Sequence, residues 1–368
     1  MNLTAIPPKG AGLESLITEQ RSCWERLQAE RRPIFIYGMG DGAAKIMTVF
    51  SRYGIPVAGI FASDEFVRGH SFAGYRVHKL SEVEDMVDDF LIVLGFAAGY
   101  PELVEYIHIL ARKHTLYVPD VPVIGGGLFT YDYCMEHLRE LNAVYRSLAD
   151  DESRRVMLNI IQFKISGLIQ YLDASTATTD AIYRTILRPT RVEDYVDLGA
   201  YNGDTIRELL EYSHRSYNTV YAVEPDKKNY KKLVNYIESN HLTRVHAYQS
   251  AAWCKDAELP FSSKSGRQSV LSPNGETMSA RSVDSLLQGK PASFIKMDVE
   301  GFEREALWGA ARTIRRCSPK LAVAVYHRNE DIFELPLLVK RLNPKYKLYL
   351  RHKLYIPAWE TNLYAIPE

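Results

Sequence analysis

The stretch YVDLGAYNGDTIRELL (residues 195–210) decides the fold class of this 368-residue chain. It opens as the end of a buried strand and closes with the three-and-four spacing of apolar residues that is typical of a helix. Between the two, Gly199 and Gly203 allow a close approach of the backbone, and Asp204 or Thr205 can cap the helix. Strand, glycine turn and helix form the repeating unit of an α/β sheet, so we predict such a sheet here.

The turn is acidic, with Asp197 and Asp204, and it has neither the lysine nor the third glycine that a phosphate site usually brings. The next strand, TVYAVEPD, ends at Glu224, where a carboxylate can accept both ribose hydroxyls of an adenosine, and Pro225 fixes the strand's exit. An adenosyl ligand without pyrophosphate and with positive charge fits this pattern, and S-adenosylmethionine is such a ligand. The alternative is an ordinary strand-to-helix bend, which also favours glycine and a capping aspartate.

The following stretch, HAYQSAAW, is predicted to be the third strand and its turn, with Ser250 and Ala251 near the adenine. Ordinary buried small residues are the alternative there. The predicted cofactor-binding set is Asp197, Gly199, Ala200, Tyr201, Asn202, Gly203, Asp204, Thr205, Glu224, Pro225, Ser250, Ala251 and Asp298.

Charged residues gather in FIKMDVEGFE, where period-two alternation puts Lys296, Asp298 and Glu300 on one side if the strand persists. At the carboxyl end of a central parallel strand they face the crevice in which such sheets bind ligands. His327 ends the strand LAVAVYH and is a candidate general base. We list all four as catalytic candidates and expect Lys296 to pair with Asp298 or Glu300.

The two carboxylates and His327 can instead hold a divalent cation that lowers the pKa of an acceptor hydroxyl. The sequence leaves general base and metal ligand open as alternatives, and it also leaves open a structural, hydrogen-bonded histidine. No metal site is assigned from the sequence alone.

The motifs VDLGAYNGDT, AVEPD and FIKMDVEGFE closely resemble those of the FkbM-type S-adenosylmethionine-dependent methyltransferases, and the resemblance covers roughly residues 150–368. It implies a class I methyltransferase fold with a seven-stranded sheet. It also implies O-methylation of a hydroxyl on a sugar, nucleotide sugar or glycan precursor, as in polysaccharide biosynthesis. Asp197, Gly199 and Gly203 match the family's cofactor turn, and Glu224 matches its ribose-binding acid. Tyr201 departs from the family, which often has a small or polar residue there.

Changes in pattern along the chain predict an α/β protein with two Rossmann-like domains joined by a helical bridge. The predicted parts are an N-terminal helix (1–32), a small Rossmann-like domain (33–128), the bridge (129–190) and the methyltransferase domain (191–368).

The first domain has a turn with Gly38, Gly40 and Gly42, and Asp64 stands just beyond its second strand. This approximate match to a dinucleotide-binding fingerprint supports an alternative function, that of a nucleotide-sugar oxidoreductase or epimerase. A third alternative is a binding module that presents a glycan or nucleotide sugar, including the case of a degenerate methyltransferase domain.

Composition narrows the possible partners. Lys plus Arg equals Asp plus Glu at 45 each, so no overall field attracts nucleic acid or acidic membranes. No apolar stretch is long enough to span a bilayer and no secretion signal is evident, which predicts a cytoplasmic location. The four cysteines lie far apart, which argues against a disulfide framework or a zinc knuckle. The expected partner is a small-molecule or glycan acceptor, and the oligomeric state does not follow from the sequence.

Overall fold

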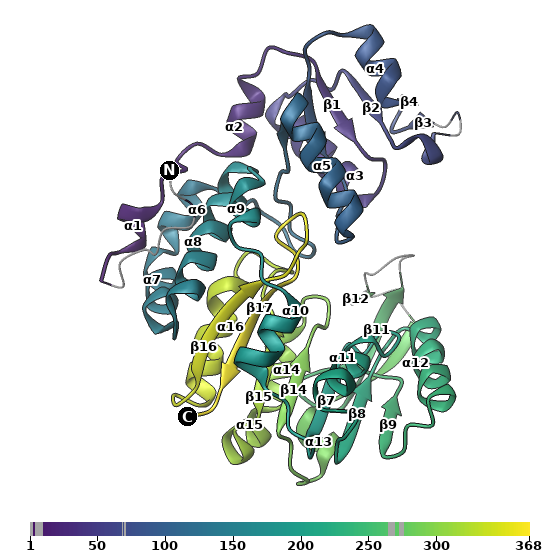
Figure 1. Cartoon of the computed structure of the whole chain (residues 1–368), viewed down its shortest axis with the longest axis vertical. Helices are drawn as coiled ribbons and strands as arrows, with labels where there is room; N and C mark the ends of the chain where they lie inside the picture. Colours follow the sequence, from purple (N-terminus) through teal and green to yellow (C-terminus); the bar gives the residue numbers. More distant parts are fainter. Residues whose placement is uncertain (1–2, 4–9, 68, 70, 264–268, 272–275) are drawn as a thin grey trace.

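The computed structural model describes residues 3, 10–67, 69, 71–263, 269–271 and 276–368. In this part the chain alternates helices and strands and builds three β-sheets, two of them mainly parallel (Figure 1). The predicted mixed α/β class is therefore confirmed. The sheet formed early in the chain and the larger sheet formed late lie at opposite ends of the molecule in Figure 1, with helices between them.

The single helix predicted within residues 1–32 is wrong. The chain forms two short helices there, α1 (Leu13–Leu16) and α2 (Cys23–Gln28). The backbone N–H of Glu25 donates to the Ser22 hydroxyl at 3.2 Å, and the backbone N–H of Ser22 donates to Glu25 Oε2 at 2.7 Å. This capping box starts a new helix at α2. Residues 1–2 and 4–9 lie outside the described residues.

The first sheet has the strand order β3-β4-β2-β1-β5-β6, and every pair is parallel except β3 with β4. Its central strand β1 is buried at all four residues, as expected for a parallel strand covered on both faces. Its elements are β1 (Ile34–Tyr37), α3 (Asp41–Tyr53), β2 (Gly59–Phe61), the 3₁₀ helix η1 (Asp64–Phe66), β3 (Ser71–Phe72), β4 (Tyr75–His78), α4 (Leu80–Met86), β5 (Leu91–Leu94), α5 (Pro101–Lys113) and β6 (Thr115–Tyr117).

A run of helices follows, and α8 is its longest member. Asp150 caps α8 by accepting from the backbone N–H of Ser153 at 2.8 Å, and it also binds Arg351 of the late sheet, with 2.6 Å between Oδ2 and Nη2. Lys164, buried near the other end of α8, contacts buried Asp120 at 2.7 Å. Helix α8 is thereby tied to both parts of the chain. The helices are α6 (Tyr131–Glu136), α7 (Leu138–Ser147), α8 (Asp151–Ser166), α9 (Gln170–Asp173), α10 (Thr179–Ile182) and the π-helix η2 (Tyr183–Leu187).

The large sheet has the order β16-β17-β15-β14-β7-β8-β9. The strands from β15 to β9 are parallel, whereas β17 is antiparallel to both of its neighbours, β15 and β16. The carboxyl ends of β7, β8, β14 and β15 therefore meet at one edge. The elements are β7 (Asp194–Leu198), α11 (Asp204–Tyr212), β8 (Thr219–Val223), α12 (Lys227–Ser239), β9 (Val245–Tyr248), β14 (Phe294–Met297), α14 (Glu303–Gly309), α15 (Ala311–Cys317), β15 (Lys320–Ala324), α16 (Asp331–Leu342), β16 (Lys347–His352) and β17 (Thr361–Ile366).

A four-stranded sheet, in the order β10-β13-β11-β12, branches off after β9. Ala251 belongs to this sheet, because it opens β10 and pairs with Ala280 of β13. The predicted third strand and turn are therefore split between two sheets. The elements are β10 (Ala251–Ala252), β11 (Ala257–Ser263), β12 (Ser269–Leu271), β13 (Glu276–Arg281) and α13 (Val283–Leu287).

Two backbone contacts join the early part of the chain to the late sheet. Ala98, after β5, exchanges hydrogen bonds of 2.7 and 2.8 Å with Ile356 in the loop between β16 and β17. The backbone N–H of Ile124 donates to the carbonyl of His327 at 3.0 Å. Both contacts lie at the carboxyl edge of the large sheet. Among the described residues, no helix has the length and apolar character needed to cross a membrane.

Candidate active site

The turn after β7 is built around Gly199. Its φ is +79°, and a Cβ added there would lie 1.8 Å from the carbonyl oxygen of Asp298. The Asp298 N–H in turn donates to the carbonyl of Leu198 at 3.0 Å. Only glycine fits this close crossing, which brings the ends of β7 and β14 together.

The predicted cap of α11 is different in the structure. Gly203, with φ +85°, is the N-cap residue and offers no side chain. Within the described residues, Asp204 accepts only from the N–H of Thr205, at 2.9 Å, and the Thr205 hydroxyl donates to Asp197 Oδ2. Thr205 thus holds the buried carboxylate below the turn.

Asp197 is fully buried at the end of β7, and burial raises the pKa of its carboxyl. Lys296 Nζ lies 3.5 Å from Asp197 Oδ1 and donates to the carbonyl of Gly199 at 2.9 Å. Burial alone would lower the pKa of Lys296, but the carboxylates of Asp197 and Asp298 raise it. The predicted pairing of Lys296 with Asp298 or Glu300 is wrong: within the described residues, its ion pair is with Asp197. Lys296 therefore supports the turn.

Glu224 follows β8 and is 5% exposed. Its two carboxylate oxygens accept from the backbone N–H groups of Tyr201 at 2.8 Å and Asp226 at 2.9 Å. Burial raises the pKa of this carboxyl to about 7. Tyr201 adopts φ +45°, so the family departure noted in the sequence falls on a left-handed residue of the turn. Each Glu224 oxygen retains a second lone pair for a ligand.

Polar atoms without partners mark the rim of this turn. Asn202 Oδ1 and Ser250 Oγ are buried and have no hydrogen-bond partner among the described residues. Buried polar atoms are nearly always paired, so these two atoms fit a site that receives a polar ligand. Ala200 is fully buried, with its N–H bonded to the carbonyl of Val223 at 3.0 Å. The predicted cofactor turn thus combines the buried Glu224 carboxylate with polar atoms that have no partner among the described residues.

A second cluster surrounds His327, which follows β15 and is 1% exposed. Its Nε2 lies 3.5 Å from Asp298 Oδ1 and 3.5 Å from Glu300 Oε2, and its Nδ1 lies 3.0 Å from Glu303 Oε1. Burial alone would lower the pKa of His327, but the carboxylates, led by Glu303, raise it well above its ordinary value. The predicted convergence of Asp298, Glu300 and His327 is what the structure has.

The backbone that brings Glu300 to His327 differs from the predicted one. Strand β14 ends at Met297, and Glu300 adopts φ +54° in a turn completed by Gly301 at φ +90°. The period-two alternation therefore does not extend to Glu300. Its carboxylate reaches His327 through the left-handed turn instead. The hydroxyl of Tyr326, 3.3 Å from Asp298 Oδ1, completes the surroundings of that carboxylate.

Glu303 was missed by the sequence reasoning. It is 1% exposed, and its Oε1 accepts from the backbone N–H of Val299 at 2.9 Å. Its place in the first turn of α14 favours a carboxylate there. The only sequence signal was a third acid in DVEGFE, three residues after Glu300.

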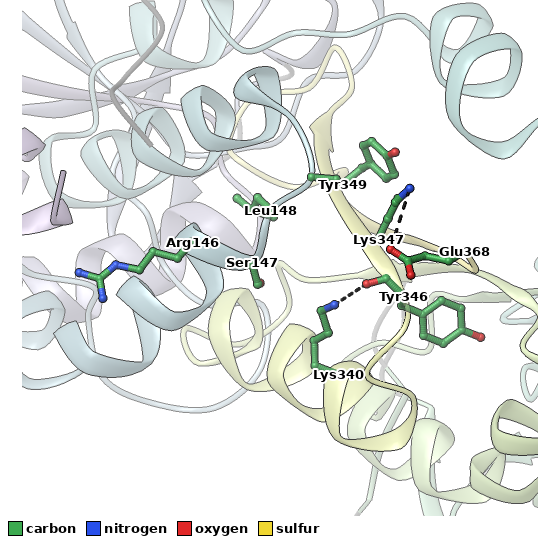
Figure 2. Close-up of a pocket in the computed structure, with 9 residues that line it drawn as sticks. Arg146, Ser147, Leu148, Lys340, Tyr346, Lys347, Tyr349 and Glu368 are labelled. Carbon is green, nitrogen blue, oxygen red and sulfur yellow. Dashed lines mark hydrogen bonds and ion pairs between the residues drawn. The ribbon is translucent and has the colours of Figure 1, made fainter. Parts of the chain in front are cut away.

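Two hollows elsewhere in the described part of the chain do not contain these residues. Figure 2 shows a pocket of about 390 Å³ in which the lysines are already engaged: Lys340 Nζ donates to the carbonyl of Tyr346 at 2.5 Å, and Lys347 lies 3.9 Å from Glu368. A hollow of about 340 Å³ near Tyr183 and His214 also lies apart from the cluster. The active-site candidates therefore rest on side-chain geometry.

The glycine turn of the first sheet is also tight. A Cβ on Gly42 would lie 2.6 Å from the carbonyl oxygen of Gly95, and Gly40 is the N-cap of α3. Asp64 belongs to η1, with a side chain that is 71% exposed and lies 3.8 Å from Lys79. The turn has the glycines of a nucleotide site, but its acid is solvated.

Comparisons with known proteins agree with a site on the large sheet. Residues 197–356 match the family model described as methyltransferase FkbM domain. None of the curated proteins matches the chain.

Among solved structures, methyltransferase FkbM from Methylobacillus flagellatus KT is 21% identical, with a TM-score of 0.71 over 99% of this chain and 95% of that one. This similarity shows a shared fold along nearly the whole chain. An rRNA methylase from Streptococcus thermophilus is 12% identical, with a TM-score of 0.34 over 51% of this chain and 92% of that one. Fibrillarin from Aeropyrum pernix, solved with S-adenosyl-L-methionine, is 12% identical, with a TM-score of 0.31 over 47% of this chain and 66% of that one.

The family match begins at Asp197, in the strand that leads into the glycine turn, and it includes Glu224, Asp298 and His327. Residues 197–356 therefore form a methyltransferase FkbM domain, and this domain supports an S-adenosylmethionine-dependent methyltransferase.

Proposed function

We propose that the protein methylates a hydroxyl group of a sugar, nucleotide sugar or glycan precursor. The observation that carries the proposal is the meeting of two acidic sites at one sheet edge. Glu224 lies beside the turn at Gly199, and Asp298 stands between this turn and His327. The choice of a carbohydrate hydroxyl is taken from the resemblance of the motifs to the FkbM type.

The turn residues fit an adenosyl cofactor. Glu224 would accept the ribose hydroxyls, Gly199 and Gly203 would let the backbone approach, and the orphan atoms of Asn202 and Ser250 would gain partners. When bound, S-adenosylmethionine supplies a methyl group on a sulfonium sulfur: the acceptor oxygen bonds to the methyl carbon as the carbon–sulfur bond breaks, and the hydroxyl proton is released.

Asp298 and Glu300 form the accessible face of the second cluster, with side chains 30% and 33% exposed, whereas His327 and Glu303 are 1% exposed. An acceptor hydroxyl therefore meets the carboxylates first. Asp298 would hold the hydroxyl in line and accept its proton, in the manner of a general base. The same cluster also has the composition of a divalent-cation site, which is a second way of activating the hydroxyl.

The test is calorimetric titration of the full chain with S-adenosylmethionine and S-adenosylhomocysteine. Glu224→Gln should weaken binding by about 100-fold or more, since hydrogen bonds to a charged group contribute roughly 1.5–3 kcal/mol each. Glu238→Gln, exposed on the neighbouring helix α12, is the matched control and should bind as the wild type does. Equal affinities of wild type and Glu224→Gln for S-adenosylmethionine would contradict the proposed cofactor site.

Binding should also depend on pH through Glu224, whose pKa in the free protein is about 7. The ribose hydroxyls need the ionised carboxylate, so below pH 7 part of the binding free energy is spent on releasing a proton. Adenosine has no group of its own that titrates near neutral pH, which makes it the suitable probe. Its affinity should fall by up to about tenfold per pH unit below 7 and level off above it.

Glu224→Gln should bind adenosine weakly and with a flat pH profile, and a wild-type profile that is flat would contradict the assignment. The contribution of Glu224 to folding stability has the opposite pH dependence from its contribution to adenosine binding. The pKa is raised from 4.5, so the carboxyl favours the folded, ligand-free protein below pH 4.5, and this contribution is lost as pH rises through about 7.

We propose that the first sheet is a binding module for the nucleotide or glycan part of the acceptor, rather than a redox domain. The solvated Asp64 and the backbone contact between Ile124 and His327 support this assignment. NAD in the same calorimeter is the check. Tight NAD binding that Gly40→Val removes would favour the oxidoreductase alternative.

A further inference from the structure

We propose that Asp298, Glu300 and Nε2 of His327 bind one divalent cation, with Glu303 behind the imidazole as an outer carboxylate. The cation would chelate two adjacent oxygen atoms of the acceptor, one of them the hydroxyl that is methylated. The acceptor part of this inference rests on the proposed function, whereas the cation site stands on the geometry of the four side chains.

The distances around Nε2 are those of metal ligands rather than of hydrogen bonds. Asp298 Oδ1 and Glu300 Oε2 each lie 3.5 Å from Nε2. Hydrogen bonds from nitrogen to oxygen span about 2.7–3.2 Å. Metal–ligand bonds of about 2.0–2.2 Å place neighbouring ligand atoms roughly 2.8–3.6 Å apart, in octahedral or tetrahedral arrangements. Both carboxylates thus lie at metal-ligand distance from Nε2, and a bound ion would draw their partly exposed side chains together.

Glu303 occupies the other side of the ring. It can be grouped with Asp298 and His327 as a possible metal ligand, but its Oε1 lies 3.0 Å from Nδ1, away from the nitrogen that faces Asp298 and Glu300. Metal-binding histidines almost always direct their second nitrogen to a carboxylate or carbonyl, which fixes the ring and raises its basicity. Glu303 is itself held by the N–H of Val299 at 2.9 Å, so this partner is rigid.

The backbone at Glu300 and an unpaired buried oxygen of Glu303 also distinguish this cluster. Glu300 adopts φ +54°, a left-handed conformation that is uncommon for a residue with a side chain. This conformation brings the Glu300 carboxylate to His327. The buried Glu303 Oε2 also has no hydrogen-bond partner among the described residues. The protein keeps a left-handed residue and an unpaired buried carboxylate oxygen at one place.

Charge favours a cation here. Three carboxylates surround one imidazole, and the nearby Lys296 is engaged with Asp197 and the carbonyl of Gly199. Two carboxylate ligands and one imidazole suit Mg²⁺, Mn²⁺ or Zn²⁺, and three protein ligands leave positions open for an acceptor. Two such positions side by side select a substrate with neighbouring oxygens, such as a vicinal diol.

The test is the binding of Mn²⁺ to the chelator-treated full chain, followed by electron paramagnetic resonance in the presence of S-adenosylhomocysteine. Asp298→Asn and Glu300→Gln should each weaken Mn²⁺ binding by at least about 100-fold. Glu303→Gln should weaken it by about 10–100-fold, the usual effect of losing an outer partner. Glu305→Gln, on the same helix α14 but outside the cluster, should leave it unchanged.

Wild-type protein that binds S-adenosylhomocysteine but not Mn²⁺ would overturn the cation site and leave the cofactor proposal standing. Mn²⁺ binding without S-adenosylhomocysteine binding would support the cation site and contradict the cofactor proposal. Circular dichroism checks that each variant is folded, and His327→Gln replaces any variant in the series that is not. Equal methylation rates for a vicinal diol and its deoxy counterpart would overturn the chelation of the acceptor.

Discussion

Lys296→Met is expected to lower the free energy of unfolding by about 3–5 kcal/mol, because it leaves a buried carboxylate without its cation. Asp197 is fully buried, and the ammonium group that it loses also holds the carbonyl of Gly199. Urea denaturation, followed by circular dichroism, measures the change. The loss should appear in the midpoint, without a change in the slope.

Lys347→Met is the matched control, since Lys347 also lies on a strand of the large sheet but is 55% exposed and 3.9 Å from Glu368. An exposed pair of this kind contributes about 0–1 kcal/mol. Adding Asp197→Asn to Lys296→Met should recover at least part of the lost stability, because the uncompensated charge is then gone. If Lys296→Met lowers the free energy of unfolding no more than Lys347→Met does, the pair of Lys296 and Asp197 does not stabilise the turn.

Asp298→Asn is expected to lower kcat/KM for methyl transfer by about 10²–10⁴-fold, the range for a lost proton acceptor. The substitution keeps the shape of the side chain and removes the charge that either a base or a cation ligand needs. The measurement is transfer of a labelled methyl group to whichever nucleotide sugar or methyl glycoside the wild type accepts.

Binding of S-adenosylhomocysteine by Asp298→Asn would show that the turn at Gly199 is intact, and Glu305→Gln should retain full activity. If Asp298→Asn retains the wild-type kcat/KM, Asp298 takes no part in methyl transfer. In that case Glu300, the other accessible carboxylate, would be the next residue to change.

The cofactor turn could be predicted because its signals are local. Strand, glycines and helix follow one another within residues 195–210, and Glu224 comes one crossover later. The capping box at Ser22 and Glu25 was equally local and could have corrected the predicted N-terminal helix. Signals of this kind need only the spacing of neighbouring residues.

Partners across strands could not be predicted in the same way. Lys296 is close in sequence to the residues expected to bind it, but its partner is set by register, which places it opposite Asp197 of β7. Ala251 falls in the stretch predicted as the third strand and its turn, yet it pairs with Ala280, 29 positions later, in another sheet. Glu303 became part of the site only because the turn at Gly301 folds α14 back over His327. Register and chain reversal are properties of the assembled sheet.

The position of β17 between β15 and β16 governs how the protein can be made. On the ribosome β15 and then β16 emerge before β17, so the edge of β15 stays open until residues 361–366 have been synthesised. Until then the nascent chain exposes an apolar strand edge, which is a template for pairing with other chains. A ribosome that stalls before residue 361 would therefore release an aggregation-prone species, and the demand for a chaperone should be concentrated in the interval before β17 is synthesised.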